Sequence, residues 1–351
     1  MYFLALPEIK QSIHDYADYG VYGYAYVEDS LIESVQNWEK NQHQYEFSKE
    51  SLILVEGVVP GIGLAIQALT KENDAVLINT PVYPPFARTV KLNNRKLVEN
   101  ALLEKNGEFL IDFKTFEKDI VENSVKLYIL CNPHNPGGRV WTKEELLKIG
   151  QICQKHNVLL VSDEIHQDLT LFGHEHHTFN KIAPDFKEFS VLLSSATKSF
   201  NIAGVKCAYA IIENKNLREK YLQRRLMNNQ QEISSLGMLA TQVANNKGAQ
   251  WLSELKEVLE KNITYVESEL HQKTKIKVMK PQGTYLVWLD FSDYKLNDKE
   301  LDKKLSEEVE VILNKGASFG QAGQAHARLN AAAPFSLIEE ATKRLVETFA
   351  I

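Results

Sequence analysis

The sequence predicts an α/β fold with a mostly parallel, doubly wound sheet and a second, smaller α+β domain. Two observations carry this prediction. From about residue 50 to residue 245, short apolar runs alternate with helix-like stretches, which is typical of parallel strands joined by helices. Past Trp251 the pattern changes to one long amphipathic stretch followed by shorter strands and helices.

The first region accounts for most of the expected strands. They are expected at Leu52–Val55, Ala75–Ile78, Lys126–Leu130, Val158–Val161, Val191–Leu193 and Cys207–Ile212. Helical patterns separate most of them, for example Gly61–Leu69 and Thr142–Lys155. The second helix begins with Thr142 and has Glu145 three residues on, which is the spacing of a capping box.

The C-terminal region has a different order of elements. We expect helices and strands, in order, at Trp251–Gln272 (helix), Thr284–Leu289 (strand), Asp298–Ile312 (helix), Ala327–Asn330 (strand) and Leu337–Phe349 (helix). Mixed elements of this length predict a small α+β unit.

Composition excludes several classes of protein. The 351 residues are 44% hydrophobic and 25% charged, which is ordinary for a globular protein. A net charge of −6, spread along the chain, argues against nucleic acid or an anionic membrane as a partner. Three cysteines without a paired pattern, no basic-flanked leader and no apolar run approaching 18 residues predict a cytoplasmic protein.

Lys198 is the most informative residue of the sequence. It stands in Ser194-Ser195-Ala196-Thr197-Lys198, just beyond the apolar run that ends at Leu193. A lysine past the carboxyl end of a buried strand lies where α/β folds bind ligands. Partly desolvated there, its amine has a lowered pKa and can form a Schiff base. The alternative for an isolated motif of this kind is a solvated surface lysine.

Asp163 and Asn135 also follow apolar runs. Asp163 ends Val158-Leu159-Leu160-Val161-Ser162-Asp163, and Asn135 lies 28 residues before it. The carboxylate could cap a helix or pair with a cation, and it could also hold a proton on a heteroaromatic nitrogen. Pyridoxal phosphate needs such a partner, because its protonated pyridinium is the electron sink for carbanion chemistry. The Asn135 amide can donate a hydrogen bond to the phenolate oxygen of that cofactor.

The segment Glu56-Gly57-Val58-Val59-Pro60-Gly61 follows a strand and opens a helix. Free N–H groups and the helix dipole favour a phosphate at such a position. We therefore expect Gly57, Val58 and Val59 to contact the cofactor phosphate, with glycine allowing close approach of the backbone. The alternative is an ordinary turn between strand and helix.

In this order and at these spacings, Asn135, Asp163 and Lys198 resemble the fold-type-I pyridoxal-phosphate enzymes, the aspartate aminotransferase superfamily. The segment from Asp163 to Leu169, D-E-I-H-Q-D-L, and the later Gly173-His174-Glu175-His176 resemble its MalY/PatB group of cystathionine β-lyases, or C–S lyases. The resemblance covers nearly the whole chain.

The resemblance implies further cofactor contacts. Ser195 and Lys206 fall where the superfamily places phosphate ligands, with Lys206 in place of the more usual arginine. Tyr83 is expected to stack on the pyridine ring, and the alternative is a core aromatic. His166 stands where aspartate aminotransferases carry tyrosine, and we expect it beside the cofactor. The resemblance also implies that Arg328, with Asn135, binds the substrate and clamps its α-carboxylate.

The resemblance also implies an assembly and a division of the chain. Tyr24 matches a tyrosine that reaches across a homodimer interface to the neighbour's phosphate, although neighbouring Tyr22 is a confusable candidate. Residues 25–250 are expected to form the large cofactor domain, and residues 1–24 with 251–351 the small domain. Relatives begin with a further segment that helps to cover the active site, and His326 replaces an aromatic residue that precedes the arginine. Both departures bear on substrate fit.

These residues predict a pyridoxal-phosphate C–S β-lyase acting on cystathionine or related cysteine S-conjugates, with a thiol, pyruvate and ammonia as products. Lys198, Asp163 and Tyr83 are the expected catalytic residues. An aminotransferase on the same scaffold is one alternative, and a regulatory binding protein is another. A nicotinamide dehydrogenase is disfavoured because no G-x-G-x-x-G opens a βαβ unit. No metal is expected, and His174, His176 and His177 are interpreted as surface residues of a turn.

Overall fold

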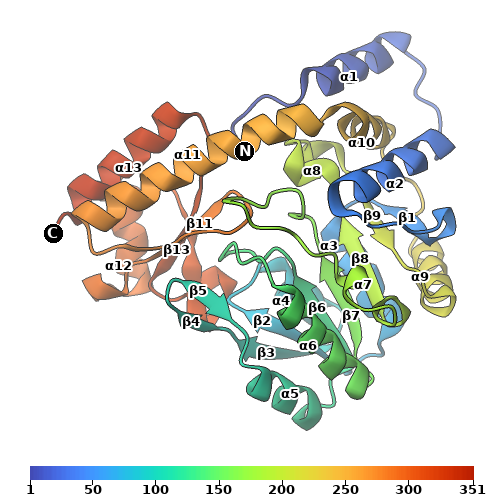
Figure 1. Ribbon diagram of the computed structural model, residues 1–351, viewed down its shortest axis with the longest axis horizontal. Coiled ribbons are helices and arrows are strands. Elements are labelled where there is room, and N and C mark those ends of the chain that lie inside the picture. The colour runs from blue at the N-terminus through green and yellow to red at the C-terminus, as the bar shows by residue number, and fades with distance from the viewer.

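A seven-stranded sheet forms the centre of the larger part of the molecule (Figure 1). The computed structural model describes residues 1–351. The spatial order is β1–β9–β8–β7–β6–β2–β3. The strands are β1 (Leu52–Val55), β2 (Ala75–Thr80), β3 (Lys96–Ala101), β6 (Leu127–Cys131), β7 (Leu159–Asp163), β8 (Ser190–Ser194) and β9 (Ala208–Ile211). Only β9 runs against its neighbours, so the predicted mostly parallel sheet is confirmed.

Helices cover both faces of this sheet. On β6, Leu127 and Ile129 face a core shared with α3 (Val58–Leu69), α4 (Pro85–Leu92) and α9 (Lys215–Met227). The alternate residues Tyr128 and Leu130 face a second core with α5 (Phe113–Glu122), α6 (Lys143–Lys155) and α7 (Phe179–Ile182). Successive strand residues point to opposite faces, so the sheet is doubly wound as predicted.

Local signals set the ends of these elements. α6 begins with the predicted capping box, in which Thr142 and Glu145 each accept the other's backbone N–H. The edge strand β3 and the hairpin of β4 (Leu103–Lys105) with β5 (Glu108–Leu110) were not expected. Their residues alternate between buried and exposed or stay exposed, so they lack the apolar run that indicates a central strand.

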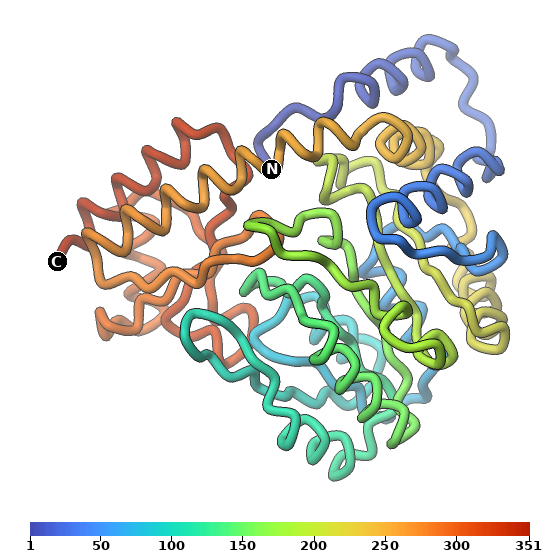
Figure 2. Tube along the Cα trace, viewed as in Figure 1, coloured from blue at the N-terminus to red at the C-terminus, as the bar shows by residue number.

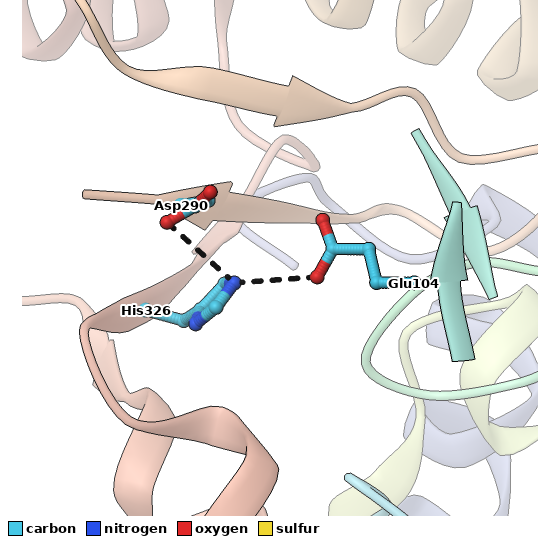
Figure 3. Close-up of side chains that lie close together, drawn as sticks. All are labelled: Glu104, Asp290 and His326. Carbon is cyan, nitrogen blue, oxygen red and sulfur yellow. Dashed lines mark ion pairs between the residues drawn. The ribbon is translucent and has the colours of Figure 1, made fainter. Parts of the chain in front are cut away.

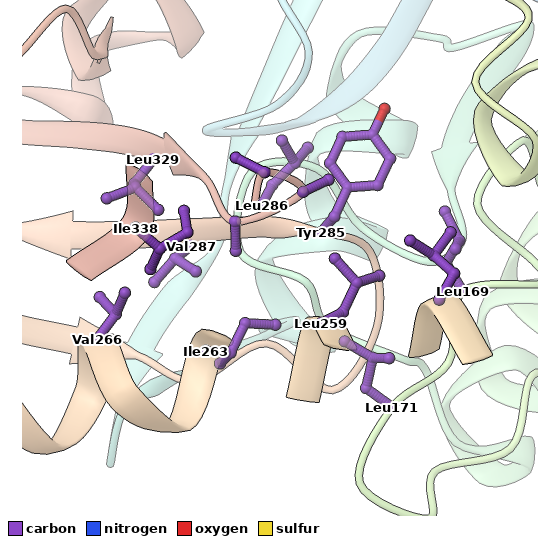
Figure 4. Packing of buried hydrophobic residues seen from close by; sticks show 14 of the residues in the cluster. Leu169, Leu171, Leu259, Ile263, Val266, Tyr285, Leu286, Val287, Leu329 and Ile338 are labelled. Atoms are coloured by element: carbon purple, nitrogen blue, oxygen red, sulfur yellow. The ribbon is translucent and has the colours of Figure 1, made fainter. Parts of the chain in front are cut away.

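A second, antiparallel sheet has the order β10–β11–β13–β12. Its strands are β10 (Lys277–Met279), β11 (Leu286–Asp290), β12 (Asn314–Lys315) and β13 (His326–Asn330). Two helices, α11 (Ala249–Lys273) and α13 (Phe335–Phe349), lie along it. Figure 4 shows Leu259, Ile263 and Val266 packed against Val287 and Leu329 of the strands.

The predicted helix Asp298–Ile312 is confirmed as far as Glu308, and only its last four residues, 309–312, are not helical. α12 covers Asp298–Lys303 and continues only as a π-helical turn, Lys304–Glu308. Glu310 then adopts a left-handed conformation, with φ of 55°, which ends the helix because such a φ cannot continue it. Ile312 is 94% exposed beyond this point.

The N-terminal segment runs across the molecule. Its first residues lie beside α11, while the C-terminus lies at the far end of that helix (Figure 2). The N–H of Tyr2 donates to the carbonyl of Ala332 at 2.7 Å. α1 (Pro7–Tyr19) and α2 (Asp29–His43) both pack against α10 (Ser235–Lys247). The division into residues 25–250 and the remainder stays a prediction.

None of the helices combines the length and the apolar character that crossing a bilayer would require.

Candidate active site

Five strands of the large sheet end around one cavity of about 450 Å³. Residues that follow β1, β2, β6, β7 and β8 line it, together with residues of the small sheet. This is the carboxyl edge, where open parallel sheets bind ligands. Of the residues predicted from the sequence, the lining includes Gly57, Val58, Val59, Tyr83, Asn135, Asp163, His166, Lys198, Lys206 and Arg328.

Asp163 is the last residue of β7 and is only 4% exposed. Its Oδ1 accepts the backbone N–H of Ile165 at 3.1 Å, which is the one hydrogen bond of the carboxylate within the protein. Burial raises the pKa of this carboxyl to about 7, against the opposing effect of the Lys198 charge. The carboxylate is therefore short of a cationic partner and faces the cavity.

Lys198 lies in the short helix α8 (Ala196–Ser199), directly after β8. The neighbouring residues Ala196 and Phe200 are buried in the core of the small sheet, which fixes the turn that carries the lysine. Burial lowers the pKa of the Lys198 amine, and Asp163 opposes this change. An amine with a lowered pKa has a larger neutral, nucleophilic fraction.

Arg328 reaches the cavity from β13 and meets Asn135 from the large sheet. Its Nη1 donates to Asn135 Oδ1 at 2.8 Å, and its Nη2 donates to Asn314 Oδ1 at 2.8 Å. Its guanidinium lies 4.9 Å from the ring centre of Phe319. Because the Asn135 oxygen is occupied by the arginine, the amide NH₂ is left to donate into the cavity.

The N-terminus of α3 opens onto the same cavity. No side chain caps this helix, and the first N–H groups of a helix have no partner within it. Gly57 has a φ of 175°, which is extended backbone, and a Cβ there would meet only the Pro60 ring at 3.5 Å. The conformation of Gly57 therefore does not require glycine, although the helix end still presents free donors.

Two predicted residues lie elsewhere. Ser195 is 2% exposed, and its hydroxyl donates to the Cys207 carbonyl at 2.6 Å and accepts the N–H of Thr197. It caps α8 behind the cavity wall, while Thr197 lines the cavity. Tyr24 is 94% exposed and lies outside the cavity of its own chain. The cofactor roles of both residues stay predictions.

The match to known proteins covers almost the entire chain. Residues 3–346 match the model of the family described as aminotransferase class I and II. The chain belongs to this family. Cystathionine β-lyase PatB of Bacillus subtilis is 38% identical over 98% of this chain and 89% of its own length.

Two solved structures are similar to this aminotransferase class I and II family member throughout. Cystalysin of Treponema denticola, which contains pyridoxal 5'-phosphate, is 34% identical, with a TM-score of 0.96 over 99% of this chain and 88% of its own. The PLP-bound C–S lyase of Staphylococcus hominis is 30% identical, with a TM-score of 0.93 over 99% and 89%. The predicted family resemblance and the fold are confirmed.

The residues of this family member fit pyridoxal phosphate. The buried Asp163 carboxylate lacks a cation, Asn135 has a free amide NH₂, and Val58 and Val59 begin an uncapped helix. These groups match, in turn, a pyridinium N–H, a phenolate oxygen and a phosphate. Lys206, Ala203 and Thr197 also line the cavity.

His166 and Tyr285 form one wall of the cavity. Their rings meet edge to face, with centroids 5.7 Å apart. Burial, together with the charges of Lys198 and Arg328, lowers the pKa of His166 to about 3. His166 is thus a neutral imidazole near pH 7, and its buried Nδ1 has no partner within the protein.

Sequence reasoning missed five polar residues of the cavity: Glu56, Thr197, Tyr285, Asn314 and Asn330. Thr197 stood inside the lysine motif, and its position next to Lys198 was a usable signal. Tyr285 and Asn314 reach the cavity only through the antiparallel pairing of the small sheet. No local pattern identifies them.

The interpretation of His176 as a surface residue is wrong. It is 7% exposed, and its Nε2 lies 2.7 Å from Oε2 of the fully buried Glu164. Glu164 also accepts the Ser162 hydroxyl at 2.7 Å and the N–H of Phe179 at 3.0 Å. The acid after Asp163 and the distant histidine motif therefore form one buried network that supports the end of β7.

Proposed function

We propose that this protein is a pyridoxal-phosphate-dependent C–S β-lyase that cleaves cystathionine or related cysteine S-conjugates to a thiol, pyruvate and ammonia. The observation that carries the proposal is the meeting of Lys198, Asp163, Asn135 and Arg328 at one cavity in a chain that resembles lyases over nearly its full length. Pyridoxal phosphate, when bound, supplies an electron sink for the carbanion at the substrate Cα.

Each residue of the cavity has a proposed role toward this cofactor. Asp163 holds a proton on the ring nitrogen, since a carboxylate with a raised pKa gains most from a cationic partner. Asn135 donates to the phenolate oxygen, and Tyr83 and His166 bound the ring. The N–H groups of Val58 and Val59, with Thr197 and the Lys206 ammonium, receive the phosphate; Gly57 and Ser195 support this group through the backbone.

The substrate is proposed to lie between the two sheets. Arg328 forms a bidentate pair with the α-carboxylate, and Asn135 holds the guanidinium in place. Lys198 then takes the proton from Cα, because its amine is partly desolvated and close to the Asp163 charge. The β-thiolate leaves once this proton is removed, which breaks the C–S bond.

The leaving group separates this reaction from transamination. A β-thiolate departs readily from a carbanion, and the cavity offers one arginine, Arg328, with no second one for the side-chain carboxylate of an aspartate-type substrate. The test is an assay of the purified holoenzyme with L-cystathionine. We expect pyruvate and free thiol without any added keto acid. Turnover that consumes an added keto acid mole for mole identifies an aminotransferase, and no turnover with the cofactor in place favours a regulatory binding protein.

The assembly and location are also proposals. Tyr24 lies exposed on the N-terminal segment, so a second copy of the chain is needed for its phenol to reach a phosphate. We propose a homodimer with shared active sites. Cys131, Cys153 and Cys207 are all free and buried, which fits a reducing compartment such as the cytoplasm.

A further inference from the structure

Three ligand-type side chains meet between the β4–β5 hairpin and the small sheet, outside the active-site cavity. They are Glu104 of β4, Asp290 of β11 and His326 of β13 (Figure 3). One ligand atom from each lies within 4.8 Å of the others. The three residues come from three strands and are far apart in the sequence, so only the fold brings them together.

The strand register explains the meeting of two of them. Asp290 and His326 are direct partners across the β11–β13 pair, and directly opposed side chains stand on the same face of a sheet. Two residues further along each strand, Trp288 and Arg328 are paired on the same face. The His326 ring stacks on Trp288, with centroids 5.1 Å apart and planes 13° apart, and this contact fixes its orientation.

The His326 imidazole is oriented as a metal ligand would be. Its Nδ1 lies 2.6 Å from the carbonyl oxygen of Gln324, so Nδ1 donates a proton there and Nε2 is the ring nitrogen that faces the two carboxylates. The His326 side chain is 10% exposed, and its buried Nε2 has no hydrogen-bond partner. A backbone carbonyl that holds the far nitrogen of a histidine is the usual support of a metal-binding imidazole.

The distances leave room for a cation. Nε2 of His326 lies 3.6 Å from Glu104 Oε2 and 3.8 Å from Asp290 Oδ1, and Figure 3 marks both ion pairs with dashed lines. These separations are too long for hydrogen bonds. Zinc binds nitrogen and oxygen at about 2.0–2.2 Å, which places neighbouring ligand atoms about 3 to 4 Å apart.

We propose that Glu104, Asp290 and His326 bind a divalent transition-metal cation that ties the β4–β5 hairpin to the small sheet. One nitrogen and two carboxylate ligands favour Zn²⁺ over the oxygen-seeking Mg²⁺. Glu104 is 38% exposed, which gives the ion access and allows water to complete its coordination. The competing cation is Lys277, whose Nζ lies 3.7 Å from Asp290 but donates to Asp293 at 3.0 Å.

The test is calorimetric titration of the holoenzyme with ZnCl₂ in a non-chelating buffer, with MgCl₂ as the comparison. We expect wild type to bind one more equivalent of Zn²⁺ than His326→Phe, a change that keeps the ring stacked on Trp288. Glu104→Gln, on the exposed hairpin, should weaken this binding by at least about tenfold, the range found even for outer-sphere changes. Zinc should raise the Tm of wild type but not of His326→Phe.

A matched control is His174→Ala, which removes an exposed histidine far from the three ligands in the sequence. It should bind zinc as wild type does. The proposal is overturned if wild type, His326→Phe and Glu104→Gln bind Zn²⁺ with equal stoichiometry and affinity, or if wild type binds none. Either result would leave the three residues as an ion pair between a protonated imidazole and two carboxylates.

Discussion

The large and small sheets contribute to the active-site cavity in different ways. The parallel sheet delivers Asp163, Asn135 and Lys198 at one edge, where Asp163 is the last residue of its strand and the other two lie in the segments that follow buried strands. The antiparallel sheet delivers Arg328 from β13 and Asn314 from the edge strand β12, and Tyr285 comes from the residue just before β11. A parallel sheet gathers its strand ends geometrically, whereas an antiparallel sheet places side chains through register.

The two sheets therefore have different expected roles: the parallel edge in the reaction and the antiparallel sheet in substrate binding. At the parallel edge, burial raises the pKa of Asp163 to about 7 and lowers the pKa of Lys198, and substitution of these residues should affect the reaction itself. Residues of the antiparallel sheet hold Arg328 in position, and their substitution should affect substrate binding. The following predictions test this separation, beginning with the largest effect.

Lys198→Ala should lower kcat for pyruvate formation by about 10⁴-fold, because it removes the group that moves the Cα proton. Borohydride treatment of wild type should fix the cofactor to the Lys198 peptide, as peptide mass mapping would show. Lys256 is a suitable control, since it is also partly buried with a lowered pKa but lies outside the cavity. Labelling at Lys256 or any other lysine contradicts the assignment.

Asp163→Asn should lower kcat by about a thousandfold, since an amide cannot hold the ring proton as a carboxylate does. The visible absorbance of the bound cofactor should shift as well. Asp168→Asn is the matched change, because Asp168 is also buried but is bonded to His43, Trp38 and Ser199. Asp168→Asn should lower the Tm and have a smaller effect on kcat. A near-normal kcat of Asp163→Asn would contradict the proposed role of Asp163 as the partner of the ring nitrogen.

The stability of the cofactor-free protein should fall as pH rises. Burial raises the folded-state pKa of Asp163 from 3.8 to about 7. Between these two pH values the carboxyl ionises in the unfolded state but stays protonated in the folded state, and this ionisation stabilises the unfolded state. From pH 5 to pH 8 this carboxyl should cost about 3 kcal/mol of unfolding free energy. Urea unfolding of wild type and Asp163→Asn would measure it. Equal pH dependence in both proteins would argue against this shift.

Arg328→Lys should lower kcat/KM by about 100-fold, mainly through KM, because lysine keeps the charge but loses the bidentate geometry. The visible spectrum should stay that of wild type. Arg344→Lys serves as the control, since its side chain is 38% exposed on α13 and pairs with Glu340 and Glu310. A fall in kcat with unchanged KM would place Arg328 in the chemistry rather than in binding.

Tyr24→Phe should weaken cofactor binding by about tenfold, which corresponds to loss of one hydrogen bond to a charged group. Tyr22→Phe is the matched control, since its hydroxyl donates to the Ala17 carbonyl within the chain. Mixed Tyr24→Phe and Lys198→Ala chains should regain activity through subunit exchange if the phenol acts across an interface. A monomer by light scattering at working concentration would contradict this prediction.

The sequence by itself determined the fold class and the residues of the parallel edge. Central strands of a parallel sheet are buried on both faces, so their sequences are apolar runs. The polar residues that follow each run lie at the carboxyl edge of the sheet. Lys198, Asp163 and Asn135 could be predicted for this reason. The capping box of α6 could be predicted from the spacing of Thr142 and Glu145. The edge strand β3 was not, because only some of its residues are buried.

Only the tertiary structure decided how the small sheet meets this edge. It joined Arg328 to Asn135 across 193 residues, buried His176 against Glu164, and turned the Ser195 hydroxyl away from the cavity. It also brought Glu104, Asp290 and His326 together. Contacts of this kind depend on register and on packing between distant elements, and local periodicity carries no information about either.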